Sequence, residues 1–196
     1  MPRLACPELA RVTLHVVQRG RSRSPCFGCA GDRLAYLDTL RECAQRERCA
    51  VHAYVLMGNH VHLLVTSVHA NGAARLMPGL AAGYSRHLRS AYGHDEALWE
   101  EPYDATPVHA RRHLFATMRY IEENPVRAGL ASHPAAYRWS SYAANALGKE
   151  DLLVTPHVHY YSLGRTPVVR RVAYAASFVA LRAEPPRSRT EAVGGE

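Results

Sequence analysis

Apolar and polar positions along the chain repeat with two periods, one typical of strands and one of helices. Residues 11–18 and 51–65 are rich in β-branched and aliphatic side chains, which predicts two strands. Gly58 interrupts the second apolar run and predicts a bulge or the turn of a hairpin. Apolar residues recur at helical spacing in residues 32–48, 73–92 and 109–123. Strands and helices in this order predict an α+β fold, with helices packed on an antiparallel sheet.

The second apolar run carries two histidines, His60 and His62, near its middle. Side chains alternate between the two faces of a strand, so both imidazoles are expected on the same face. Two neutral imidazoles on one face are a typical start of a metal site. The alternative is chance, since the chain has 12 histidines and a second His-x-His at His157 and His159. That second copy follows Pro156 in a loop-like context, and we interpret it as surface or packing histidines.

The helix expected over residues 109–123 has a narrow apolar stripe that predicts its buried face. The stripe consists of Leu114, Met118 and Ile121. Tyr120 points away from it, and Asn124, four residues later, shares the side of Tyr120. Pro125 is expected to end the helix, which would place Asn124 at its terminus. Taken alone, Tyr120 also fits an ordinary packing tyrosine, and Asn124 also fits a C-cap.

The charge of the chain favours nucleic acid as a partner. The net charge is +7, the pI is about 9.4, and Lys149 is the single lysine among 24 basic residues. Arginine presents a planar fork suited to phosphate, although GC-rich coding also enriches it. The sequence has neither an apolar run of membrane-spanning length nor an apolar leader, so we expect a cytoplasmic protein without membrane contacts. Given its positive charge, we expect it to associate with the nucleoid.

The 196 residues are expected to form one catalytic domain with appendages. We assign residues 1–148 to that domain and residues 149–183 to a C-terminal extension that packs on it or contacts DNA. Residues 184–196 have the composition of a disordered tail. The odd cysteine count argues against a disulfide framework. Cys26 and Cys29 have the spacing of half a zinc site but lack a suitable second pair, so free thiols are expected.

Five ordered blocks of sequence resemble the single-tyrosine HUH transposases, and most closely the REP-associated tyrosine transposases. The blocks are residues 14–20, 54–65, 98–100, 119–130 and 137–142. They contain the His60 and His62 pair, the Leu-Trp-Glu element at residues 98–100, and the Tyr-x-x-x-Asn-Pro sequence that begins at Tyr120. The resemblance covers most of the chain, and the order of the blocks is more specific than any block alone.

The resemblance implies a ferredoxin-like (RRM-like) antiparallel sheet, a transposase-like single-stranded DNA endonuclease and strand transferase activity, and DNA transposition. Tyr120 would be the nucleophile that forms a 5′-phosphotyrosine link. His60, His62 and Asn124 would bind a divalent metal ion, Mg²⁺ or Mn²⁺. The substrate would be single-stranded DNA beside a hairpin or palindromic repeat. The resemblance is compatible with either a monomer or a homodimer.

Other residues have expected roles around this site. Arg19, Arg21 and Arg23 lie in a basic Gly/Ser/Pro segment suited to phosphate contacts, and Arg127 follows the tyrosine helix. His15, on the first strand, is expected either to orient the site or to pack.

The sequence departs from the family pattern after its Leu-Trp-Glu element. Glu101 and Pro102 stand where the family usually has a Gly-Arg pair. This departure keeps open a domesticated protein that binds hairpins without cutting them.

Overall fold

The computed structural model describes residues 11–93 and 97–180. Four strands form one antiparallel sheet in the order β2-β3-β1-β4. They are β1 (Thr13–Arg19), β2 (Cys49–Leu56), β3 (His60–Ser67) and β4 (Asp104–Val108). Helices α1 (Ala30–Arg46) and α2 (Gly72–Tyr92) connect them in the order β1-α1-β2-β3-α2-β4. This is the ferredoxin-like arrangement that was expected.

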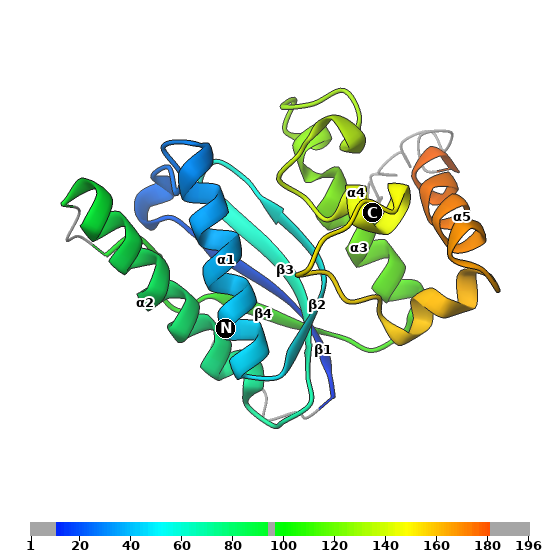
Figure 1. Ribbon diagram of the computed structural model, residues 1–196, viewed down its shortest axis with the longest axis horizontal. Coiled ribbons are helices and arrows are strands. Elements are labelled where there is room, and N and C mark those ends of the chain that lie inside the picture. Colours follow the sequence, from blue (N-terminus) through cyan, green and yellow to red (C-terminus); the bar gives the residue numbers. More distant parts are fainter. Residues whose placement is uncertain (1–10, 94–96, 181–196) are drawn as a thin grey trace, which may run out of the picture.

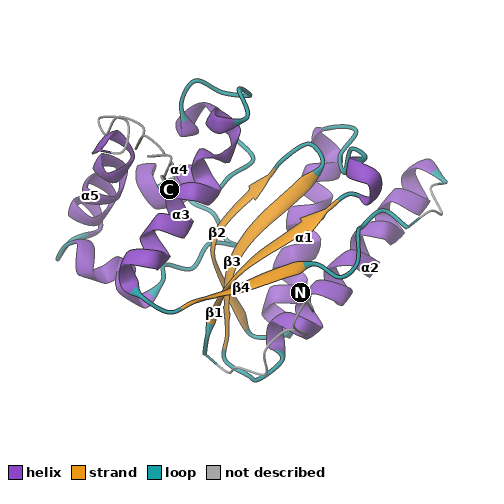
Figure 2. Ribbon diagram, turned by 180° about the vertical axis from the view of Figure 1, so that it is seen from behind, coloured by secondary structure: helices purple, strands orange, loops and turns teal. Residues whose placement is uncertain are grey.

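Three layers result, because helices cover both faces of the sheet (Figure 1). Helices α1 and α2 lie on one face, and α3 (Arg111–Arg127), α4 (Tyr142–Leu147) and α5 (Pro167–Ala180) lie on the other side (Figure 2). Short 3₁₀ helices, η1 (Arg21–Arg23), η2 (Pro134–Ala136) and η3 (Val158–Leu163), lie in the connecting segments.

Alternation along the strands divides the apolar core between these two faces. Leu14, Val16 and the odd-numbered residues of β3 pack with α1 and α2. Leu64 packs on the opposite face with Leu114, Met118 and Ile121 of α3, so the apolar stripe expected on this helix is confirmed. His60 and His62 share the parity of Leu64 and therefore face α3.

The second apolar run forms a hairpin. Strands β2 and β3 pair over most of their length, and Gly58 lies in the turn between them. The hairpin places His60 at the first residue of β3 and His62 two residues later. The expectation of a turn just before the histidines is confirmed.

The expected end of the tyrosine helix is wrong. Helix α3 continues through Pro125 to Arg127. Gly129, at φ +71°, ends it, since the Leu130 N–H donates to the Pro125 carbonyl and the Gly129 N–H donates to the Val126 carbonyl. A left-handed glycine with this pair of bonds is a stronger stop than a proline in the last turn. Asn124 therefore lies inside the helix, one turn after Tyr120.

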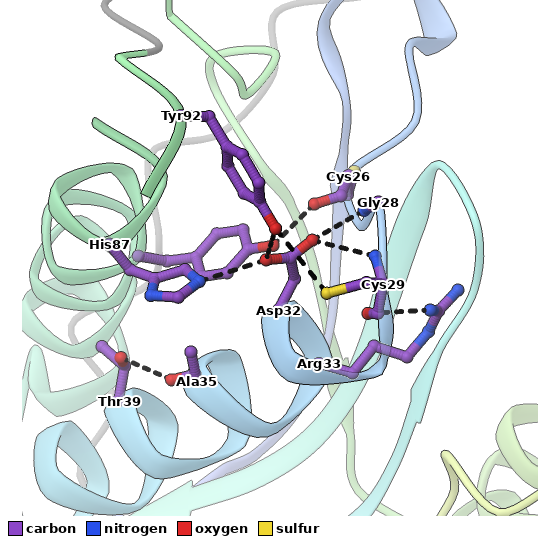
Figure 3. A network of polar contacts seen from close by, with 10 residues as sticks. Cys26, Gly28, Cys29, Asp32, Arg33, Ala35, Thr39, His87 and Tyr92 are labelled. Carbon is purple, nitrogen blue, oxygen red and sulfur yellow. Dashed lines mark hydrogen bonds and ion pairs between the residues drawn. The ribbon is translucent and has the colours of Figure 1, made fainter. Parts of the chain in front are cut away.

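A buried carboxylate, Asp32, fixes the segment before α1 (Figure 3). It accepts hydrogen bonds from the Gly28 and Cys29 amides at 2.8 and 3.0 Å, and from Tyr92 and His87 of α2 at 2.9 and 3.1 Å. Burial alone would raise the pKa of Asp32, but these donors hold it below its ordinary value. The start of α1 is thus tied to the end of α2.

The described cysteines, Cys26, Cys29, Cys43 and Cys49, are free thiols, in agreement with the sequence interpretation. Cys6 and the tail expected over residues 184–196 lie outside the described residues. No helix in the described part of the chain combines the length and apolar character needed to cross a membrane. The assignment of residues 149–183 as an extension stays a prediction.

Candidate active site

His60 and His62 lie side by side on the α3 face of the sheet, with ring centroids 5.0 Å apart. His62 is almost fully buried, whereas His60 is half-buried at the start of the strand. Nδ1 of His60 is 2.8 Å from the side-chain oxygen of Asn59, in the hairpin turn. This bond orients the His60 ring and leaves Nε2 as the nitrogen suited to a ligand.

His15 of β1 bonds to the second histidine. Its Nε2 is 3.0 Å from Nδ1 of His62, and the two rings stack with centroids 5.2 Å apart. Strands β1 and β3 are neighbours, and Val17 pairs directly with His62, so His15 reaches it diagonally across the pair. Nδ1 of His62 is used in this bond, which leaves Nε2 as its available nitrogen.

Burial keeps these imidazoles neutral. Burial lowers the pKa of His62 to about 3, and electrostatic interaction with His15, His60 and Arg19 adds to this effect. Burial and His113 lower the pKa of His15 to about 4. The pKa of His60 is also lowered, chiefly by burial and then by Arg19. Neutral rings retain the lone pairs that metal coordination requires.

Tyr120 of α3 lies against the bonded rings of His62 and His15. Its ring makes edge contacts with His62 and His15, with centroid distances of 5.7 and 6.0 Å. The residue is 39% exposed, so solvent and a substrate have access to it. The apolar stripe of α3 packs into the sheet, and the tyrosine on the adjacent side of the helix is thereby brought against the histidines. Tyr120 and the two rings that it contacts, which lie 58 and 105 positions before it in the sequence, thus form one cluster.

Asn124 completes the cluster from the next turn of α3. Its side-chain nitrogen donates to the Tyr120 carbonyl at 3.3 Å, and a further hydrogen bond joins its side chain to the His60 ring and opposes the lowering of the His60 pKa. The amide of Asn124 and the ring of His60 are therefore close enough to share one ligand. Among the described residues no group of three His, Cys, Asp or Glu side chains forms a metal site. A site here consequently depends on the Asn124 amide.

Two nitrogen donors and one amide oxygen suit a divalent ion that keeps open positions for substrate. Such an ion fits the neutral rings of His60 and His62. It also fits the hydrogen bond between Asn124 and the His60 ring, which an ion bound by both groups would replace.

The sequence model of the family described as IS200-like transposases matches residues 8–124 of the chain. This match spans more than half of the sequence and contains both histidines and Tyr120. The chain belongs to the IS200-like transposase family. The resemblance found in the sequence is confirmed at this level.

One solved structure shares the fold, and two others have a weaker likeness to the chain. A REP-associated tyrosine transposase bound to a REP hairpin has a TM-score of 0.64 and 14% identity, over 81% of this chain and 93% of that one. A crystal structure of a putative transposase from Deinococcus radiodurans R1 has a TM-score of 0.43 and 20% identity, over 62% and 97% of the two chains. A bacterial tRNA(His) guanylyltransferase-like protein in complex with GTP also has a TM-score of 0.43, with 14% identity over 67% and 72%. No curated protein matches the sequence.

The arginines expected to contact DNA lie at different places around the site of this IS200-like transposase. Arg19 and Arg23 line a cavity of about 530 Å³ together with Asn59, His60 and Glu100. Arg127 covers the Tyr120 ring, with its guanidinium carbon 5.2 Å from the ring centroid. Arg21 is exposed in η1 and lines neither of the cavities at the site.

A second cavity, of about 550 Å³, lies on the other side of the tyrosine. It is lined by His15, Tyr120 and Arg127, and also by His113, Arg119 and Glu123 of α3. Sequence reasoning missed these last three residues and also missed Asn59. Helical spacing from Tyr120 was a usable signal for His113 and Glu123, which lie seven residues before it and three after it. Arg119 and Asn59 could be placed only from the folded structure.

A buried carboxyl group, Glu122, holds α3 against the C-terminal helices. It accepts hydrogen bonds from Ser141 at 2.6 Å, Asn145 at 2.9 Å and Tyr174 at 2.8 Å. Burial raises the pKa of Glu122 to about 7, although the three donors oppose the rise. Because Glu122 is two residues after Tyr120, this network fixes the helix that presents Tyr120.

Proposed function

We propose that this protein is a metal-dependent single-stranded DNA transposase or endonuclease that uses Tyr120 as its nucleophile. The observation that supports it most strongly is the contact of Tyr120 with His62 and His15 across three separate elements. A tyrosine that serves only for packing is not expected to contact two histidines, His15 and His62, whose rings are already oriented by a hydrogen bond. Family membership adds independent support.

The proposed reaction is a transesterification. The Tyr120 oxygen forms a bond to the phosphorus of a DNA phosphodiester, and the bond from phosphorus to the 3′ oxygen breaks. The phenolic proton is lost, and the departing 3′ oxygen takes up a proton to become a hydroxyl. The 5′ phosphate remains linked to Tyr120, so the bond energy is conserved and rejoining needs no ATP.

A phenol with an ordinary pKa near 10 is mostly protonated at neutral pH and needs help to react. A divalent ion held by His60, His62 and Asn124 would supply Lewis-acid stabilisation of the phosphate oxygens. Mg²⁺ and Mn²⁺ are the ions we expect in use. Asn59 and His15 would orient the two rings as hydrogen-bond partners of their second nitrogens.

The proposed substrate is single-stranded DNA next to a hairpin or palindromic repeat. A REP hairpin is bound in the solved structure of a REP-associated transposase with the same fold. Arg19 and Arg23, which line a cavity with His60, and Arg127, which covers the Tyr120 ring, would contact phosphates of this strand. A net charge of +7 favours such binding.

The test is formation of a covalent protein–DNA adduct. The full chain is incubated with Mn²⁺ or Mg²⁺ and a single-stranded hairpin oligonucleotide taken from repeats that flank its gene. A denaturing gel should show a shifted protein–DNA species for the wild type. Tyr120→Phe should bind the same oligonucleotide but form no adduct, because the nucleophilic oxygen is absent.

Tyr161→Phe is the matched control, since Tyr161 is an exposed tyrosine on η3, outside the cluster. It should form the adduct at the wild-type rate. Tight hairpin binding without any adduct would instead support the domesticated, non-cutting protein that the Glu101 and Pro102 departure left open. An adduct that persists in Tyr120→Phe would show that the nucleophile is misassigned.

A further inference from the structure

A third cavity lies on the opposite face of the sheet from the histidine pair. It has a volume of about 420 Å³. Its lining combines Gln18 of β1, Met77, Pro78 and Ala81 of α2, and residues 100–103 before β4. Gln18 has the parity of Leu14 and Val16, so it faces α2 rather than α3.

The pairing of the strands explains why the cavity exists. Gly20 pairs with Trp99, and Val17 pairs with Asp104. Between these points β1 has two residues, whereas the partner segment has four, from Glu100 to Tyr103. The longer segment must loop away from the sheet, and the space under the loop opens above Gln18. This loop contains the Glu101 and Pro102 departure from the family pattern.

Gln18 is a buried acceptor without a partner. The residue is 3% exposed, and its side-chain oxygen has no hydrogen bond among the described residues. Buried polar atoms are nearly always hydrogen-bonded, so an orphan that lines a cavity indicates a missing ligand. Two acidic residues, Glu100 and Glu101, line the same space. The polar groups that define the cavity are thus mainly acceptors, beside apolar surface from Met77, Pro78 and Ala81.

The cavity adjoins the basic cavity beside His60. Glu100 lines this cavity and also the basic cavity that contains Arg19, Arg23 and His60. Two carboxylates repel a phosphate, whereas two arginines attract one. A nucleotide next to the reacting phosphate would therefore place its phosphate among the arginines and its base in the acceptor-rich cavity.

We infer that this cavity binds one unpaired guanine of the DNA strand and gives the enzyme base selectivity. Guanine offers adjacent N1–H and N2–H donors, which match a carboxylate in a bidentate pair. A third acceptor, such as the Gln18 oxygen, suits the second hydrogen of the amino group. Thymine offers one donor and two acceptors and fits poorly. This inference rests on the proposed function, since it requires single-stranded DNA in the neighbouring basic cavity.

The experiment measures fluorescence anisotropy of labelled 12-mers bound to the full-length chain in EDTA, where cleavage does not interfere. The probes are oligothymidine and the same oligomer with one central guanine, inosine, adenine or cytosine. We expect the guanine probe to bind about tenfold more tightly than oligothymidine. Inosine lacks the amino group and should lose most of this gain.

Glu101→Gln should reduce the guanine-to-thymine affinity ratio to below about twofold, because one carboxylate is lost. Glu101 is exposed, so the variant is expected to fold. Gln18→Leu should also lower the ratio. Glu150→Gln is the matched control: Glu150 is exposed on the C-terminal segment, and its loss changes net charge equally but should leave the ratio unchanged.

The guanine-to-thymine affinity ratio tests the base site separately from the proposed DNA cleavage. Oligothymidine binding with no preference for guanine would overturn the base site and leave DNA binding intact. A guanine preference that survives in Glu101→Gln would also overturn it, because the base would then be read elsewhere. Failure to bind any of these 12-mers would overturn the base site, whereas the proposed cleavage is judged separately by the adduct formed on the hairpin oligonucleotide.

Discussion

The chain contains two His-x-His sequences of identical spacing, and the structure gives them opposite surroundings. His60 and His62 lie on β3, and each uses Nδ1 in one hydrogen bond that orients the ring. His157 and His159 lie at the start of η3. Nε2 of His157 is 3.1 Å from the Thr13 hydroxyl, and its Nδ1 accepts from the His159 amide at 3.1 Å. Both nitrogens of His157 are therefore used within the fold.

A third histidine, His52, lies beside the second His-x-His sequence and strengthens the contrast between the two copies. His52 contacts His157 edge-on, with centroids 4.7 Å apart, so histidines also gather at the second copy. Yet His52 bonds through Nδ1 to the Thr155 carbonyl and through Nε2 to the Thr66 hydroxyl. Closeness of imidazoles is thus insufficient for a metal site. What matters is which groups the rings bond: His52 bonds the Thr155 carbonyl and the Thr66 hydroxyl, whereas the His60 ring bonds Asn124, the third residue expected to hold the ion.

The largest expected difference between the two copies is in DNA cleavage. His60→Ala should lower the adduct-forming rate by about a thousandfold or more while hairpin affinity stays near that of the wild type. His159→Ala should change the rate by less than about twofold. Single-turnover kinetics with Mn²⁺ measure both. Cleavage by His60→Ala in metal-replete buffer would show that the metal assignment is wrong.

The second difference concerns metal binding in the absence of DNA. Mn²⁺ at about 100 times its dissociation constant should stabilise the metal-free protein by about 2.7 kcal/mol. For a chain of this size that raises the melting temperature by roughly 5–10 °C. His62→Ala should abolish the shift, and His157→Gln should keep it. Thermal melts with and without Mn²⁺ measure the shift in melting temperature. A shift in His62→Ala equal to that of the wild type would show that the ion binds elsewhere.

The third difference runs in the other direction, because the second copy should matter more for stability. His157→Ala removes a buried ring and leaves the Thr13 hydroxyl with one partner fewer, at a cost of about 1–3 kcal/mol in the free energy of unfolding. His60→Ala should cost less than about 1 kcal/mol in metal-free protein. Urea denaturation measures both values. A reversed order would contradict the structural role given to His157.

The smallest expected effect is in the pH dependence of stability. Burial, with help from His52 and His159, lowers the pKa of His157 to about 4, against 6.5 in the unfolded chain. Between these values the unfolded state binds the additional proton, so stability rises as pH increases from 4 to 6.5. His157→Gln should reduce this slope by up to about 1 kcal/mol per pH unit. Urea midpoints across that range measure it, and an unchanged slope would contradict the prediction.

The sequence predicted the fold well where periodicity decides it. The apolar runs located β1 and the β2-β3 hairpin, and the stripe on α3 located its buried face, because each pattern reflects burial directly. The helix end was mistaken since Pro125 is a local signal, whereas the left-handed Gly129 stop depends on backbone geometry. The local sequence rule therefore ended the helix at Pro125, whereas in the folded chain the helix ends before Gly129.

The candidate site was predictable in its residues but not in its surroundings. His60, His62, Tyr120, Asn124 and His15 do lie together, although their chemical roles stay predictions. The Glu122 network and the Gln18 cavity join residues from distant parts of the chain. No periodicity or short motif encodes such contacts, so only the assembled fold reveals them.

The pairing register of β1 with β3 also determines what a misfolded molecule could do. Side chains change faces with every residue, so a slip by one position would turn His15 or the histidine pair toward α1 and α2. Those imidazoles would then have to be desolvated inside an apolar layer, and Tyr120 would face aliphatic side chains. A misregistered molecule would be both unstable and unable to cut. For a protein proposed to cut DNA, the hydrophobic pattern that directs folding thus also ensures that misfolded molecules of this protein are inactive.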